Sequence, residues 1–89
     1  MQARIFVMGF VQGVGFRGFV KSNARKFGLR GWVRNTDDGR VEILAQGSKD
    51  DIQKLIKLCE RGAFLSEVKS VAVDWEKEEE QFESFETTH

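Results

Sequence analysis

The chain has 89 residues, equal numbers of acidic and basic side chains and 40% apolar residues, including eight Phe and two Trp. This length suits one compact domain over residues 1–89 with no second core, and the aromatic content argues against intrinsic disorder. A lone cysteine, Cys59, excludes an internal disulfide, and no apolar run approaches the ~20 residues of a membrane span. We therefore expect a cytoplasmic protein without membrane association, and the zero net charge gives no argument for nucleic acid.

The first part of the chain predicts a strand followed by a helix. Residues 3–10 are rich in β-branched and aromatic side chains, which is typical of a strand. A glycine-dense segment, residues 9–18, comes next. Apolar residues then recur at helical spacing from Phe16 to Phe27, and Gly28 is suited to end this helix.

The middle of the chain predicts a hairpin and a second helix. Residues 29–36 and 40–46 have the composition of strands, and Asp37-Asp38-Gly39 between them is a hairpin signal in which the two aspartates act as turn formers. Ser48 with Asp51 three residues later resembles a capped helix start. An apolar face that includes Cys59 follows, and Gly62 closes the helix.

The last part of the chain predicts one clear strand and a less certain element. Residues 68–75 alternate as a strand, residues 76–81 form a polar turn, and residues 82–85 form a short last strand or an ordered tail. The order is that of the ferredoxin-like split βαβ sandwich (βαββαβ), an α+β fold with an antiparallel sheet and two helices on one face. Because this fold serves many functions, function must be inferred from particular residues.

The glycine-dense segment is a candidate anion site. Glycines let consecutive backbone N–H groups face an anion, and the start of a helix adds partial positive charge. Arg17 lies in the first turn, where its guanidinium can bind two phosphate oxygens at once. Residues 1–40 carry eight Lys and Arg against two Asp, and residues 41–89 carry six against twelve Asp and Glu. This division either creates a positive face or arises by chance, and a plain strand-to-helix turn is the simpler reading of the loop.

Three known phosphate motifs fit the loop only in part. Residues 13–18 match the G-x-G-x-x-G pattern of dinucleotide sites, with Asp37 and Asp38 about 20 residues further on. That site needs parallel strands, whereas the hairpin turns the chain back. A cysteine phosphatase would need its nucleophile at the position of Val11, and the loop lacks the Gly-Lys-Ser/Thr ending of a nucleotide P-loop.

Two further interpretations, RNA binding and catalysis by a histidine, also have weak support. Residues 17–20 resemble part of an RNA-binding signature, but Phe19 and Val20 are expected on the face of the helix that packs into the core. The only histidine, His89, is the last residue and is expected to be a disordered end. No His, Cys and carboxylate cluster has zinc spacing, so we expect no metal and no cofactor.

The candidate site thus contains Gln12, Arg17, Asn35 and backbone amides but no good general acid. Phosphate esters release alkoxides, which need a proton or a metal. A carboxylic–phosphoric anhydride releases a carboxylate, a weak base that departs unaided. Catalysis can then consist of positioning and charge stabilisation, so these residues favour acyl phosphates as substrates.

Two long motifs resemble the acylphosphatase family, and the resemblance covers essentially the whole chain. They are residues 9–17 (GFVQGVGFR) and residues 28–35 (GLRGWVRN), the latter followed by residues 38–43 (DGRVEI). The resemblance implies that Arg17 binds the phosphoryl oxygens and that Asn35 orients the attacking water. It also implies direct in-line attack on phosphorus without metal or phosphoenzyme, with the phosphate helping to accept the proton of the water. The loop amides that it assigns to the phosphate belong to Gln12, Gly13, Val14, Gly15, Phe16 and Arg17.

The C-terminal third departs from the family pattern. Ala63 follows Gly62 where many relatives have proline, and the acidic ending, residues 82–89, differs from some relatives' tails. These departures concern the last strand and the turns rather than the site. Phe16 and Trp32, like the cysteine, are expected to be packing residues.

The function expected from the resemblance is hydrolysis of small acyl phosphates to carboxylate and inorganic phosphate by a monomer. A second reading is a module that binds carbamoyl phosphate or another anion, as in the N-terminal domains of hydrogenase-maturation carbamoyltransferases. A third is a structural or RNA-binding ferredoxin-like domain. The absence of a linker before the end of the chain at His89 favours the free-standing enzyme.

Overall fold

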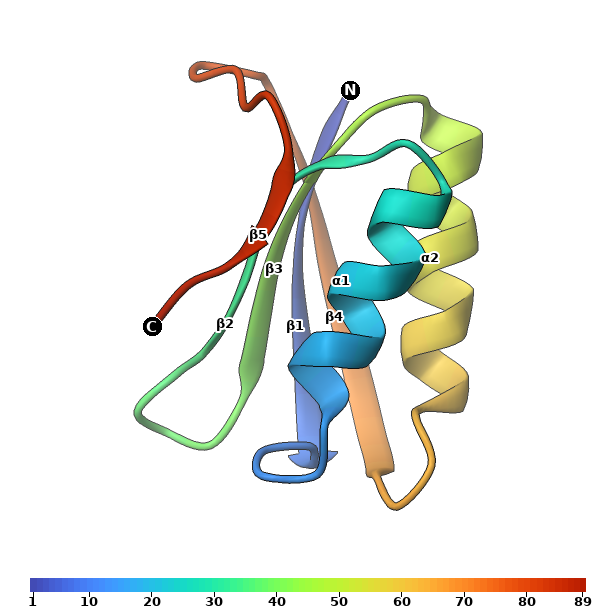
Figure 1. Ribbon diagram of the computed structural model, residues 1–89, viewed down its shortest axis with the longest axis vertical. Coiled ribbons are helices and arrows are strands. Elements are labelled where there is room, and N and C mark those ends of the chain that lie inside the picture. Colours follow the sequence, from blue (N-terminus) through green and yellow to red (C-terminus); the bar gives the residue numbers. More distant parts are fainter.

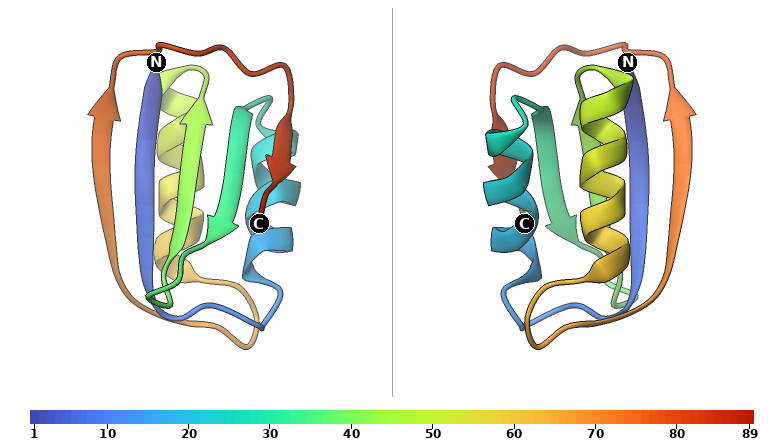
Figure 2. Two further views of the ribbon diagram at one scale, coloured as in Figure 1. Left: turned by 90° about the vertical axis from the view of Figure 1, so that its left-hand side faces the viewer. Right: turned by 90° about the vertical axis from the view of Figure 1, so that its right-hand side faces the viewer.

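A computed structural model describes all residues, 1–89, as one five-stranded sheet covered on one face by two helices (Figures 1 and 2). The strands lie in the order β4-β1-β3-β2-β5. Every neighbouring pair is antiparallel except β2 and β5, which are parallel. The predicted ferredoxin-like arrangement is therefore confirmed, with the difference that β5 makes the sheet mixed. The elements are β1 (Gln2–Phe10), α1 (Phe16–Lys26), β2 (Arg30–Asn35), β3 (Val41–Gln46), α2 (Lys49–Arg61), β4 (Glu67–Glu76) and β5 (Phe85–Thr87).

The strand directions determine which parts of the chain meet. β1 and β2 are both antiparallel to β3, so they run the same way, and β5 runs parallel to β2. These three strands consequently run toward the same end of the sheet, the lower end in Figures 1 and 2. The loop after β1, Asn35 at the end of β2 and the chain after β5 are thereby brought to one region.

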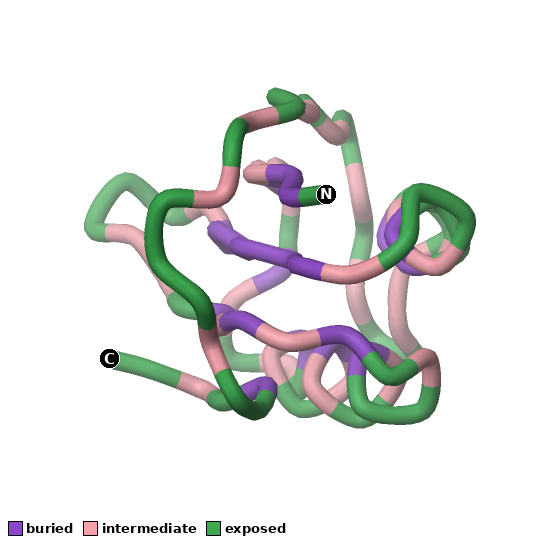
Figure 3. The backbone as a smooth tube through the Cα atoms, turned by 90° about the horizontal axis from the view of Figure 1, so that it is seen from above, coloured by how far each residue is buried: buried purple, intermediate pink, exposed green.

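The core lies between the sheet and the helices, where the purple segments of Figure 3 gather. α1 packs over β2 and β5, and α2 packs over β1 and β4. Phe16 and Cys59 are buried in this core, as predicted, and burial raises the pKa of the Cys59 thiol to about 12. Trp32 lies on the other face of the sheet, within 6 Å of the guanidinium groups of Arg4 and Arg34. The buried side chains from the central strands and helices include Ala3, Ile5, Val7, Val20, Ala24, Val41, Ile43, Ala45, Ile52 and Leu55.

The predicted helix boundaries are confirmed. Ser48 accepts a hydrogen bond of 3.1 Å from the amide of Asp51, which caps α2. Gly28 follows α1 with a φ of 70°, a left-handed conformation suited to the end of a helix. Neither helix is long and apolar enough to cross a membrane.

The prediction for the last strand is wrong in its position. The strand begins only at Phe85, whose side chain is buried and whose backbone pairs with Gly31 of β2. Phe82, expected at the start of this strand, instead lines a hollow on the open face together with Leu44. Phe85 thus packs in the core and Phe82 lies on the opposite, open face of the sheet. Their spacing in the sequence does not predict this difference.

The close pairing of β2 and β3 depends on Gly31, and this gives a test. An added Cβ would lie 1.9 Å from the backbone oxygen of Leu44, and the φ of 132° is strained for other residues. We expect Gly31→Ala to lower the free energy of unfolding by about 2 kcal/mol or more. The matched control is Gly18→Ala, whose Cβ would meet nothing within 4 Å. It should be neutral or stabilising by up to about 1 kcal/mol in the helix, and equal losses in urea denaturation would contradict the close approach.

Candidate phosphate site

A hollow of about 210 Å³ lies where the three strand ends meet. It is bounded by the loop after β1, the first turn of α1, the end of β2 and β5. Four of the predicted phosphate-binding residues line it, together with the predicted water-orienting asparagine and three residues that were not predicted. The lining residues are Val11, Gly13, Gly15, Phe16, Arg17, Gly18, Asn35 and Thr87.

The loop presents the open start of α1 to this hollow. Gly13 and Gly15 have φ values of 75° and 80°, the left-handed region that favours glycine. Gly15 precedes the helix, no side chain caps it, and no acidic residue lies in the first turn. None of the backbone hydrogen bonds made outside helices and strands uses an amide between Gly13 and Gly18 as donor. These N–H groups and the helix dipole are therefore available to an anion.

The start of α2 shows what the start of α1 lacks. Ser48 caps the helix, and Asp50 and Asp51 lie in its first turn. The N-terminus of α2 is thus capped and faced by oxygen atoms of the chain's own side chains, whereas the N-terminus of α1 has no such side chains.

Arg17 differs from most arginines of this protein. None of the ion pairs involves Arg17, whereas Arg4, Arg25, Arg34 and Arg40 each pair with a carboxylate. The only side-chain partner of its guanidinium is Nδ1 of His89, 3.1 Å from Nη1. The terminal histidine, expected to be a disordered end, thus lies against Arg17 in this structure. No carboxylate lies within ion-pair distance of Arg17, which leaves its charge available to a phosphoryl group.

Asn35 contributes an unsatisfied acceptor. Its Oδ1 is buried and has no hydrogen-bond partner, although the residue lines the hollow. An unpaired buried acceptor costs about 1–3 kcal/mol, so this oxygen is suited to a donor brought by solvent or substrate. Water is such a donor.

Gln12 fastens the loop to the hairpin that follows Asn35. Its Nε2 donates hydrogen bonds to the backbone oxygens of Thr36, at 2.8 Å, and of Arg40, at 2.7 Å. The side chain therefore fixes the distance between the loop and the end of β2. Neither Gln12 nor Val14 lines the hollow, and Val14 packs against the core. Their predicted contribution to phosphate binding remains a prediction about their backbone amides.

The hairpin turn itself is held by Asp38, as predicted for a turn former. Its carboxylate accepts hydrogen bonds from Nε of Arg40, at 2.9 and 3.0 Å, and from the hydroxyl of Thr36. Chiefly the bonds from Arg40, and then the one from Thr36, lower the pKa of Asp38 to about 2. The turn that carries Asn35 is thus stabilised by a charged carboxylate.

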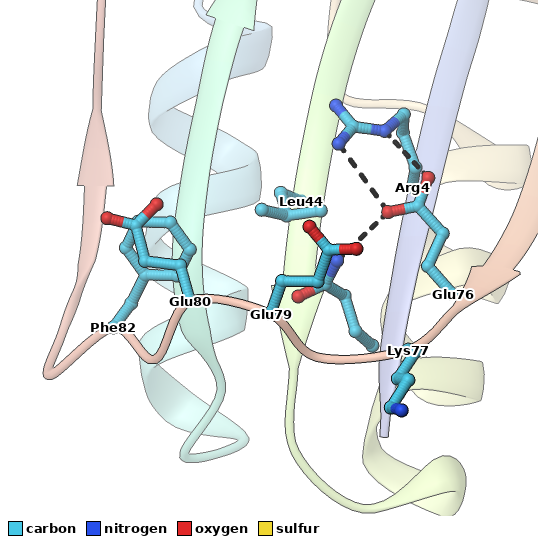
Figure 4. A pocket seen from close by; sticks show the side chains of 8 residues that line it. Arg4, Leu44, Glu76, Lys77, Glu79, Glu80 and Phe82 are labelled. Carbon is cyan, nitrogen blue, oxygen red and sulfur yellow. Dashed lines mark hydrogen bonds and ion pairs between the residues drawn. The ribbon is translucent and has the colours of Figure 1, made fainter.

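A larger hollow of about 510 Å³ on the open face of the sheet is unsuited to phosphate (Figure 4). Glu76, Glu79 and Glu80 line it, and their charges repel an anion. Arg4 lies in this hollow as well, but it is paired with Glu76 at 2.9 Å and with Glu42 at 2.6 Å. The hydrogen bonds from Arg4 hold the pKa of Glu76 below its usual range, so both groups stay charged.

Several cations of the first half of the sequence pair with carboxylates of the second half, among them Arg4 and Arg34. Glu86 pairs with Lys21 and Arg25 of α1, and Glu78 pairs with the amino terminus. No group of three or more His, Cys, Asp and Glu side chains is placed to hold a metal ion.

A family profile described as acylphosphatase matches residues 3–87. The chain belongs to the acylphosphatase family. A curated acylphosphatase of Bacillus licheniformis is 47% identical over 85 residues, which are 96% of this chain and 94% of that protein. The chain is accordingly a hydrolase that acts on acid anhydrides, with acyl phosphates as substrates and phosphate as product.

Solved structures agree with this assignment. The crystal structure of acylphosphatase from Bacillus subtilis superimposes with a TM-score of 0.95 at 43% identity, covering 99% of this chain and 98% of that one. The structure of full-length HypF in the phosphate- and nucleotide-bound form matches with a TM-score of 0.85 at 30% identity. That match covers 99% of this chain but 12% of HypF. The acylphosphatase fold therefore occurs both as a separate chain and within a much longer one.

The ion pair in the hairpin turn predicts how stability depends on pH. Because folding lowers the pKa of Asp38 from its unfolded value near 3.9 to about 2, the stabilisation is complete above the unfolded pKa and is lost as pH falls through the folded one. Wild type should be more stable than Asp38→Asn at about pH 6, and the difference should be much smaller at about pH 2 and vanish near pH 1. Asp37→Asn removes a neighbouring carboxylate that makes no hydrogen bond and controls for net charge. A difference that persists unchanged at low pH in urea denaturation would contradict the ion pair.

Proposed function

We propose that this acylphosphatase cleaves acyl phosphates by in-line attack of water on phosphorus, without a metal ion. In this proposal Asn35 holds the water, and Arg17 binds the phosphoryl oxygens together with the loop amides. The observation that carries the proposal is the buried, unpaired Oδ1 of Asn35 in the same hollow as the uncompensated guanidinium and the open start of α1. An oxygen that can accept a hydrogen bond from water thus lies beside several N–H groups that can donate hydrogen bonds to a phosphate.

In this proposal, Arg17 and the loop amides account for binding of the phosphoryl group and for part of the catalysis. In phosphoryl transfer the charge is spread over the three equatorial oxygens. Amides from Gln12 to Arg17 and the fork of the guanidinium are the donors that we assign to these oxygens. Rigid donors of this kind stabilise a transition state because they need not reorganise during the reaction.

The water is oriented by one hydrogen bond. If Oδ1 of Asn35 accepts one O–H of the water, the lone pair of the water is free to face phosphorus opposite the acyl oxygen. A bond then forms between the water oxygen and phosphorus while the bond to the acyl oxygen breaks. The acyl group leaves as a carboxylate with the bonding electrons, and both protons of the water end on inorganic phosphate.

The leaving group makes an acid unnecessary. A carboxylate has a conjugate acid with a pKa near 4, so it departs at neutral pH without a proton. Because Arg17 and the amides supply positive charge to the phosphoryl group, we propose that no metal ion is needed. The residue set is consequently suited to anhydrides and poorly suited to esters.

We further propose that the chain acts as a single-domain monomer that does not bind RNA. Val20 is buried and Phe19 packs partly buried against the core of α1, so neither is available to stack on bases. On the open face, Arg4 and Arg34 are paired with the buried carboxylate of Glu42. Paired cations attract phosphate backbones weakly.

The assignment predicts which side chains the reaction requires. With a synthetic acyl phosphate and excess chelator, we expect Arg17→Ala and Asn35→Ala to lower kcat/KM about 100-fold or more. Arg17→Lys should be impaired almost as severely, because an ammonium group cannot replace the bidentate fork. Arg61→Ala removes an exposed arginine without an ion pair from the end of α2, and it should behave like the parent.

Three outcomes would contradict the proposal. Variants of Arg17 and Asn35 that are as fast as the parent would show that the site lies elsewhere. Phosphate binding without turnover of any acyl phosphate would favour an anion-binding module. Loss of the parent's activity in chelator would contradict the metal-free reaction.

A further inference from the structure

The turn between α2 and β4 presents two large apolar side chains to solvent. Phe64 is 89% exposed and Leu65 is 70% exposed, which makes them the most exposed large apolar residues of the chain. We propose that this turn holds the alkyl chain of the substrate, so that the enzyme binds acyl phosphates with longer alkyl chains more tightly than acetyl phosphate. The inference rests on the proposed function, because it concerns the leaving group of the same site.

The backbone of this turn is strained at Leu65. The amide of Ser66 donates a hydrogen bond of 3.0 Å to the carbonyl oxygen of Ala63, which closes a β-turn. Leu65, the third residue of the turn, has a φ of 72° and is the only residue other than glycine with a positive φ. Such turns favour glycine at this position, because a Cβ is unfavourable there. Local stability therefore does not explain the large apolar side chain, and backbone strain of this kind is typical of functional sites.

The pairing of β1 with β4 brings the turn next to the phosphate loop. Phe10, the last residue of β1, lies opposite Glu67, the first residue of β4. The loop that continues from Phe10 to α1 and the turn that leads into Glu67 therefore leave the same end of the sheet. They lie side by side at the lower end of the molecule (Figures 1 and 2). The two apolar side chains thus belong to a segment beside the proposed phosphoryl site.

The in-line reaction determines the direction in which the acyl group leaves. Water held by Asn35 attacks phosphorus from one side, so the bond to the acyl oxygen points to the opposite side. The phosphate loop lies between the hairpin that follows Asn35 and the turn that carries Phe64 and Leu65 (Figure 1). The acyl group is therefore directed away from the hairpin and toward the turn. An acetyl group ends near the loop, whereas a longer alkyl chain can extend to the turn.

The chemistry of the turn favours an uncharged acyl chain. Residues 62–66 (GAFLS) carry no charged side chain. Their one side-chain hydrogen bond joins the hydroxyl of Ser66 to the carbonyl oxygen of Ala63 at 2.7 Å. The turn therefore offers no partner to the charged end of a dicarboxylic or amino-acid acyl group. Apolar surface, in contrast, is removed from water with a gain in proportion to its area.

A series of straight-chain acyl phosphates tests the inference. With acetyl, butyryl, hexanoyl and octanoyl phosphate, each below its micelle concentration, the KM of the parent should fall progressively, about ten-fold from the first to the last. Because the chain does not react, it binds equally in the ground and transition states, and kcat should stay within about two-fold. In the double variant Phe64→Ser, Leu65→Gly, the KM for octanoyl phosphate should rise to within about two-fold of that for acetyl phosphate.

Two further variants separate a role in binding from a role in folding. Glycine adopts the φ of Leu65 without strain, so Leu65→Gly should keep or raise the midpoint of urea denaturation while it raises the KM for octanoyl phosphate about three-fold or more. Trp75→Ala is the matched control, since Trp75 is a large apolar residue, 41% exposed, at the other end of β4. This variant should keep the parent's dependence of KM on chain length.

The outcomes distinguish this inference from the proposed function. Equal KM values for all the acyl phosphates in the parent would overturn the inference and leave the proposed function intact. If the double variant in that case also lost binding to phosphatidylcholine vesicles, or lost dimers seen with the parent, the turn would belong to a membrane surface or to a second copy of the chain. A parent protein that hydrolyses none of the acyl phosphates would instead overturn the proposed function.

Discussion

The site depends on one constraint of the sheet, the common direction of β1, β2 and β5. Since β3 is antiparallel to both β1 and β2, and β5 is parallel to β2, three strands end at one side of the molecule. The glycine loop, Asn35 and the segment that ends at His89 are therefore neighbours although they are far apart in the sequence. The two hydrogen bonds from Gln12 to the hairpin then fix the loop relative to Asn35.

The distribution of charged side chains also favours anion binding in this region. Carboxylates of the acidic C-terminal half pair with cations of the basic N-terminal half, as at Arg4, Lys21 and Arg25. Arg17 meets no carboxylate, and the start of α1 beside it has neither a cap nor an acidic first turn. An anion approaching this protein therefore finds an unopposed positive charge together with unused amides in one hollow.

Local patterns predicted the elements that depend on local physics. The helix ends at Ser48 and Gly28, the hairpin at Asp38 and the packing role of Cys59 followed from capping, turn and periodicity rules. The site pair Arg17 and Asn35 came from residue inventory together with a family resemblance. What was missed depends on contacts across more than 50 residues: β5 beside β2, Thr87 in the hollow and His89 on Arg17. No local sequence pattern predicts such long-range contacts, and a histidine at the end of the chain belongs to no helical or strand pattern from which its position could be predicted.

The claim that connects these features is that water attacks phosphorus rather than the carbonyl carbon of the substrate. Hydrolysis of a synthetic acyl phosphate in water labelled with oxygen-18 tests it directly, with both products analysed by mass spectrometry. The arrangement of Asn35, Arg17 and the loop predicts that the label enters inorganic phosphate and that the carboxylate stays unlabelled. Label in the carboxylate would mean that the carbonyl carbon is attacked, and it would contradict the roles assigned to both residues.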